Sequence, residues 1–120
     1  MAEELAPITL FGISISTAGA KGEKVRLGLY RRDLNDLPTS LILDGGEIFI
    51  DTTGIKLVAC DVKVSARRLP YIAVETKDKK ISALSGIYNY ANKSYIADYP
   101  TISAEAQKKH TLKQVIEWGN

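Results

Sequence analysis

A regular alternation of apolar and polar residues, interrupted at short intervals by turn residues, most constrains what this chain can fold into. The alternation is clearest after residue 24, where Val25, Leu27 and Leu29 recur at every second position before a polar loop that contains Pro38. A period of two places alternate side chains on opposite faces of an extended strand. Turn residues recur every ~8–12 positions, which is the spacing typical of a sandwich or barrel. The pattern therefore predicts an all-β domain built from half-buried antiparallel strands.

The alternation also predicts which side chains point inward. Phe11, Ile13 and Ile15 share one face of the first strand, and Tyr30 is expected to face outward from the second, with Arg26 and Gly28. Asp44-Gly45-Gly46 is predicted to close a short third strand and Asp51-Thr-Thr-Gly54 a fourth, with Gly45 and Gly54 where a positive φ or a close backbone approach is needed. The expected strands are residues 7–17, 25–31, 41–43, 48–50, 55–64, 70–76 and 81–84.

The strand at residues 55–64 is expected to be central. Leu57 and Ala59 fall on one face, and Val58, Cys60 and Val62 fall on the other. Because both faces are apolar, we expect this strand to be covered on two sides.

The chain, with 120 residues, is expected to form a single domain over 1–120, with its core in residues 8–86. The segment 87–120 is rich in tyrosine and asparagine at its start, and residues 103–109 favour a helical turn capped by Ser103. Residues 110–118 fit either a strand or a helix. The strand is slightly favoured because Trp118 would then pack inward.

Charge and composition argue against two classes of partner. The chain has 16 basic and 14 acidic residues, a net charge of +2, and mixes both signs along its length. A nucleic-acid-binding surface needs a concentration of positive charge, so no nucleic acid is expected as a partner. The pairs Arg31-Arg32 and Arg67-Arg68 are interpreted as solvated strand ends rather than phosphate contacts. No apolar run reaches the 18 or more residues of a membrane span, so no membrane insertion is expected.

Cys60 and the N-terminal residues bear on the compartment. One cysteine cannot form an internal disulfide, and its apolar strand predicts a buried, inert thiol. The first seven residues lack the basic and apolar regions of a signal peptide. We therefore expect a soluble product made in a cytoplasm, which can finish in an extracellular particle.

Five short segments, in their order and spacing, resemble a module found in bacteriophage tail fibres, head fibres and other virion proteins. They are Thr17-Ala-Gly-Ala-Lys-Gly22, Arg26-Leu-Gly-Leu-Tyr30, Leu37-Pro-Thr-Ser-Leu-Ile-Leu-Asp-Gly-Gly-Glu47, Thr52-Thr-Gly-Ile-Lys56 and Leu69-Pro-Tyr-Ile-Ala-Val74. The resemblance covers residues 8–86. The last segment departs from the family, which carries a glycine-tryptophan-tyrosine-tryptophan run at that place.

The resemblance implies a fold and a role. The fold would be an antiparallel jelly-roll-like β-sandwich, and the role that of a non-enzymatic virion structural protein: a capsid decoration, a head fibre or a tail-fibre module. Its partners would be other virion subunits, commonly in a homotrimer, and a host-surface glycan. The protein would be located in the virion after synthesis in the host cytoplasm. The alternative that the residues leave open is a stand-alone carbohydrate-binding, lectin-like module.

No catalytic or metal-binding pattern stands out. The single histidine, His110, has no nucleophile motif beside it, and most loop carboxylates are explained by turn chemistry. The segment Asp33-Leu-Asn-Asp36 lacks the spacing of a calcium loop, so an Asx-turn is preferred. We therefore expect neither an enzyme, nor a metal site, nor a cofactor.

The tyrosine- and asparagine-rich segment is the one site-like feature. Flat aromatic faces next to amide groups suit sugar rings, and they suit protein interfaces equally well. The alternative is that these tyrosines close the open end of the sandwich or lie between subunits. The candidate ligand or interface residues are Tyr88, Asn89, Tyr90, Asn92, Tyr95 and Tyr99.

Overall fold

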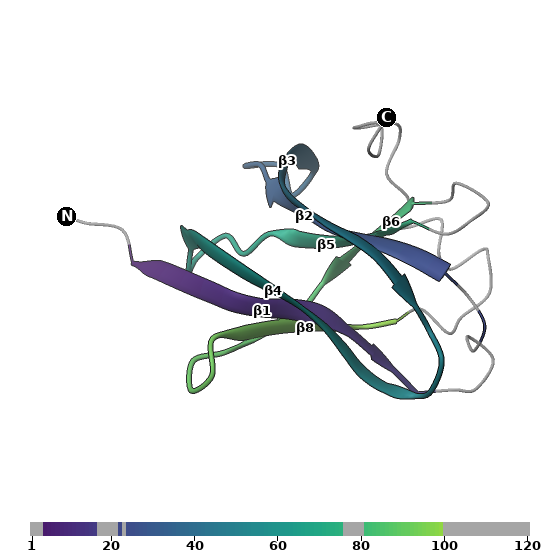
Figure 1. Cartoon of the computed structure of the whole chain (residues 1–120). Coiled ribbons are helices and arrows are strands. Elements are labelled where there is room, and N and C mark those ends of the chain that lie inside the picture. Colours follow the sequence, from purple (N-terminus) through teal and green to yellow (C-terminus); the bar gives the residue numbers. More distant parts are fainter. Residues whose placement is uncertain (1–3, 17–21, 23, 76–80, 100–120) are drawn as a thin grey trace.

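Two packed β-sheets form the structure, which is a computed structural model of the whole chain and describes residues 4–16, 22, 24–75 and 81–99. Figure 1 shows the two layers, with β1, β4 and β8 in one and β2, β5 and β6 in the other. The predicted all-β sandwich is confirmed at this level. The strands are β1 (Leu5–Ile15), β2 (Lys24–Arg32), β3 (Pro38–Phe49), β4 (Gly54–Ser65), β5 (Tyr71–Glu75), β6 (Ile81–Ser85), β7 (Ile87–Asn89) and β8 (Ser94–Asp98).

Among the described residues, each sheet has four strands, in the orders β4-β1-β8-β7 and β3-β2-β5-β6. All pairs are antiparallel except β1 with β8, which run parallel in the middle of the first sheet. The expectation of a purely antiparallel sandwich is corrected by this pair. The chain returns to the first sheet at β7, and a short turn then leads into β8. This turn makes β8 antiparallel to β7, and in that direction β8 runs parallel to β1.

The core fills the space between the sheets and is made by the alternate residues that the sequence predicted. Phe11, Ile13 and Ile15 from β1 face Leu27 and Leu29 from β2, and all five are buried. Ile48 from β3 is half-buried and packs against this cluster. The period of two therefore identified the inner face of each of these strands.

The predicted third and fourth strands are one continuous strand, β3, so that prediction is wrong. The expected Asp-Gly-Gly turn is instead a bulge, because Leu27 pairs with Gly46 and the next residue, Gly28, pairs with Asp44. Gly45 is the extra residue. A bulge uses the same small, turn-favouring residues as a hairpin, since both need a local departure from regular pairing.

The prediction that residues 55–64 form a central strand is also wrong. The strand β4 lies at the edge of its sheet and pairs only with β1 among the described strands. Val58, Cys60 and Val62 pack against the core, whereas Leu57 and Ala59 are exposed. The apolar outer row is therefore an uncovered surface and does not indicate a second covering layer.

Tyr30 lies on the outer face of its sheet, as predicted, but it is fully buried rather than solvated. It forms a second, smaller cluster with Ala73 and Ala83, against which Leu41 and Tyr71 pack. An outward position in the period-two pattern does not guarantee contact with solvent when neighbouring strands carry apolar residues on the same face.

The expectations for residues 103–109 and 110–118, and those for His110 and Trp118, lie outside the described residues. Within the ranges that the structure describes, no helix has the length and apolarity needed to cross a membrane.

Candidate binding surfaces

The six predicted site residues come from β7, β8 and the segments that adjoin them, but they do not form one exposed cluster. Tyr88 and Tyr90 are the two whose rings meet: their centroids lie 4.7 Å apart in an edge-to-face arrangement. Tyr88 is half-buried, and its hydroxyl donates to the carbonyl oxygen of Pro7 at 2.6 Å. Tyr90 is 66% exposed, so it is the ring of this pair that a ligand could reach.

Asn89 and Asn92 build the turn between β7 and β8. The Asn89 Oδ1 accepts from the backbone N–H of Ala91 at 2.8 Å, and the Asn92 Oδ1 accepts from the hydroxyl of Ser94 at 2.7 Å. Lys93 adopts a positive φ of 58° at the same turn. Both amide oxygens are therefore engaged in local structure, as asparagine side chains are in Asx-turns.

Tyr95 and Tyr99 are part of the packing instead of the surface. Tyr95 is 1% exposed; its hydroxyl donates to the Pro70 carbonyl oxygen at 2.6 Å and accepts from the Gly86 N–H at 3.0 Å. Burial raises the pKa of this hydroxyl. Tyr99 is half-buried against the core. Tyr95 and Tyr99 therefore pack within the sandwich. This position agrees with the alternative interpretation, in which the tyrosines close the open end of the sandwich instead of binding a ligand.

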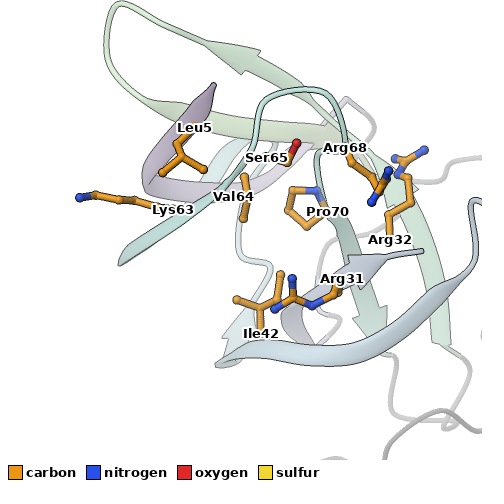
Figure 2. Close-up of a pocket in the computed structure, with 9 residues that line it drawn as sticks. All are labelled: Leu5, Arg31, Arg32, Ile42, Lys63, Val64, Ser65, Arg68 and Pro70. Carbon is orange, nitrogen blue, oxygen red and sulfur yellow. The ribbon is translucent and has the colours of Figure 1, made fainter. Parts of the chain in front are cut away.

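A pocket of 290 Å³ opens between the two sheets at the end where β1 begins and β2 and β4 end. We call it the basic pocket. It is lined by Leu5, Arg31, Arg32, Ile42, Lys63, Val64, Ser65, Arg68 and Pro70. Figure 2 shows the guanidinium groups of Arg32 and Arg68 on the same side, Arg31 beside Ile42, and the Lys63 ammonium directed outward at the rim.

The basic pocket was not predicted from the sequence. The two arginine pairs were visible in the sequence, but they lie more than 30 residues apart, and only the sandwich brings members of both to one cavity. The feature of the sequence that could have indicated this pocket was an arginine pair at each of two predicted strand ends.

A second candidate surface is the outer side of the sheet β4-β1-β8-β7. Leu57 pairs with Gly12, Gly12 with Ile96, and Ile96 with Ile87, so these residues form one row across all four strands. The preceding row, Val58, Phe11, Tyr95 and Tyr88, packs on the core, which places the row of Leu57 on the opposite face. Leu57 is 44% and Ile87 81% exposed. We call this row the apolar face.

The loop carboxylates are engaged in structure. The Asp33 Oδ1 accepts from the N–H groups of Asn35 and Leu37, both at 2.8 Å, which confirms the predicted Asx-turn. Asp44 forms a two-point ion pair with Arg26. Among the described residues, no group of three or more histidine, cysteine or acidic side chains is placed to hold a metal ion.

Cys60 is half-buried, and its thiol donates to the carbonyl oxygen of Ile8 at 3.3 Å. Burial raises the pKa of this thiol. A raised pKa leaves less thiolate, the nucleophilic form. The predicted burial of this side chain is only partial.

Comparison with known proteins identifies no relative: no family model, no curated protein and no solved structure matches the chain.

Proposed function

We propose that the chain is a non-enzymatic structural component of a bacteriophage particle: a capsid decoration, a head fibre or a tail-fibre module. Two features support the proposal. The first is the resemblance of five segments over residues 8–86 to such modules. The second is the arrangement of the eight described strands in two sheets of four, because jelly rolls also consist of eight strands in two sheets. A jelly-roll-like connection of the strands is part of the proposal.

The apolar face is the observation that carries the proposal. A protein that works alone rarely leaves apolar side chains together across a whole sheet, whereas a subunit of an assembly buries them against its neighbours. Leu57 and Ile87 lie at opposite edges of the sheet, with Ile96 between them. The exposed side chains of the row therefore lie at both edges of the sheet, with the half-buried Ile96 and the buried Gly12 between them.

The proposed partner of the apolar face is another virion subunit, and a second copy of this chain is favoured. The favoured state is a homotrimer, in which each of the three subunits would bury its apolar face against a neighbour. Adhesion to a host surface would then be a property of the loops left outside the assembly.

Light scattering coupled to size exclusion tests this proposal. We expect the wild-type protein to elute as an oligomer, and Leu57→Lys together with Ile87→Lys to convert it to a monomer, because two buried ammonium groups oppose association. Leu34→Lys is the matched control, since Leu34 is as exposed as Ile87, at 81%, but lies in the loop after β2. The Leu34→Lys variant should remain oligomeric.

Two outcomes would contradict the proposal. A wild-type monomer at every concentration would favour the alternative, a stand-alone lectin-like module whose exposed ring is Tyr90. An oligomer that survives the double substitution would show that the apolar face is not the contact. Capsid or tail genes beside the gene of this chain would be independent support.

A further inference from the structure

The basic pocket concentrates positive charge far beyond the average of the molecule. The chain as a whole has a net charge of +2, yet four of the nine residues that line this pocket are cations: Arg31, Arg32, Lys63 and Arg68. None of the described lining residues is acidic. Cations that share one concave, low-dielectric wall raise the local potential and attract anions.

Three of these cations have no carboxylate partner among the described residues. Arg31, Lys63 and Arg68 form no ion pair with any described residue, and the side chain of Arg32 has one, a 3.8 Å contact with Asp36, which is 77% exposed. Elsewhere in the described structure, paired arginines such as Arg26 have close partners, at 2.7 Å. Within the part of the chain that the structure describes, little offsets the positive charge of the pocket, and a bound anion would supply that compensation.

Arg32 is held in place before any ligand arrives. Its Nε donates to the Leu69 carbonyl oxygen at 3.0 Å, its Nη2 donates to the Ser85 hydroxyl at 2.9 Å, and its guanidinium lies 4.1 Å from the centre of the Tyr71 ring. Its side chain is 19% exposed. An arginine fixed in this way holds its positive charge at one place in the wall of the pocket, although its Nε and Nη2 are not free for a two-point contact with an anion.

The apolar residues that line the pocket indicate what the uncharged part of a ligand would be. Leu5, Ile42, Val64 and Pro70 contribute apolar surface to the same cavity. A volume of 290 Å³ is at the small end of ligand pockets, where one ring-sized unit fits. A neighbouring hollow of 360 Å³ shares Arg32 and Arg68 but is also lined by Asp33 and Asp36, so the proposed anion site is confined to the basic pocket.

We propose that the basic pocket binds an oxyanion, a carboxylate or a phosphate, carried on a compact ring such as an acidic sugar unit. The exposed guanidinium groups of Arg31 and Arg68 would bind the anion, because the planar fork of arginine matches the oxygens of both groups. Arg32, whose Nε and Nη2 are already engaged, would add a fixed positive charge. The apolar walls would contact the ring. Such binding does not require the subunit contacts proposed above, and its test uses other residues and another readout.

Titration calorimetry with four probes at low salt tests the proposal: glucuronic acid, glucose 6-phosphate, glucose and inorganic phosphate. We expect both acidic sugars to bind with a Kd of about 1 mM or tighter, and inorganic phosphate to bind more weakly because it lacks the ring. Neutral glucose should not bind. A preference for glucuronic acid would assign a carboxylate sugar, and a preference for glucose 6-phosphate would assign a phosphorylated one.

Substitutions locate the binding to this cavity. Arg31→Gln with Arg68→Gln should weaken binding of the better probe by at least about tenfold, because two charge-assisted contacts are lost. Arg67→Gln is the matched control: Arg67 is adjacent in sequence and also exposed, but it does not line the basic pocket. It should change the Kd by less than about twofold. Because Arg31 and Arg68 are exposed, the double variant should melt at the wild-type temperature or above it, since it also loses repulsion between like charges. Arg67→Gln should melt at the wild-type temperature, and scanning calorimetry checks both variants.

The proposal is overturned if neither acidic sugar binds, or if glucose binds as tightly as they do. An Arg67→Gln loss equal to that of the double variant would also overturn it, because that result would indicate diffuse attraction by surface charge. Equal affinity for inorganic phosphate and glucose 6-phosphate would overturn the role assigned to the apolar walls.

Discussion

Gly45 illustrates how one residue is fixed by a contact from the other sheet. A Cβ added at this glycine would lie 2.7 Å from Cζ of the buried Phe11 ring and 3.1 Å from the Leu27 carbonyl oxygen. Gly45 belongs to β3 and Phe11 to β1, so the ring reaches across the core to the bulge. The predicted need for a close approach at Gly45 is therefore confirmed, although it arises in a bulge. At Gly54 the predicted positive φ is also confirmed, with a value of 116°.

Gly45→Ala is expected to destabilise the fold by about 1–3 kcal/mol, because an overpacked core must displace the ring or the backbone. Urea unfolding measures the change. Ser40→Ala, at an exposed position of the same strand, should have almost no effect. Adding Phe11→Leu to Gly45→Ala should cost less than the sum of the two single changes, since a smaller side chain leaves room for the methyl group. Strict additivity would show that the ring does not cause the loss.

At the scale of elements, the β2–β3 pair is held at its bulge by an ion pair. Arg26 donates from Nε and Nη2 to the two carboxylate oxygens of Asp44, at 3.2 and 2.7 Å, and Asp44 also accepts from the Gly46 N–H at 3.0 Å. The hydrogen bonds from Arg26 are the main reason that the pKa of Asp44 lies below its ordinary value of 3.8. The carboxylate thus joins the two strands and fixes the shape of the bulge.

This pair predicts how stability depends on pH. Because the pKa of Asp44 is lower in the folded chain than in the unfolded one, the pair contributes fully above about pH 4 and its contribution is lost as the pH falls through the folded pKa. Asp44→Asn should therefore lower the free energy of unfolding by about 1–2 kcal/mol at pH 7 and by less at pH 3. Asp61→Asn, at an exposed carboxylate on β4, is the control. A loss of equal size at both pH values would contradict this explanation.

At the scale of the whole molecule, Tyr95 connects the two layers. It belongs to β8 in the first sheet, and its hydroxyl binds the carbonyl oxygen of Pro70, just before β5 in the second. The same hydroxyl accepts from Gly86, where the chain passes from β6 back to β7. One side chain therefore satisfies two backbone groups at two crossings between the sheets.

Tyr95→Phe should lower the free energy of unfolding by about 1–3 kcal/mol, because a buried carbonyl and a part-buried N–H lose their partner. Tyr71→Phe is the matched control: its hydroxyl donates to the Asp36 carbonyl oxygen at an exposed site, where water can replace it. Chemical denaturation of both variants measures the difference. Equal losses would indicate that the Tyr95 hydroxyl has no special role between the sheets.

Features that depend on local pattern were predictable from the sequence, and features that depend on contacts between distant segments were not. Phe11, Ile13 and Leu29 were placed correctly because inward direction depends only on position within a strand. The predicted position of β4 failed because an apolar outer row looks the same whether another layer covers it or solvent does. The arginines of the basic pocket were seen one pair at a time, because nothing local indicates which strand ends lie together.

The sequence by itself determined the all-β class, the inner face of the main strands and the absence of an obvious catalytic motif. These follow from the period of two and from turn chemistry, which act within a few residues. Only the tertiary structure decided that β4 lies at an edge, that β1 and β8 run parallel, and that Arg31, Arg32 and Arg68 line one cavity. The reason is physical: strand order is selected by the burial of surfaces from distant segments, and no single segment encodes its neighbour.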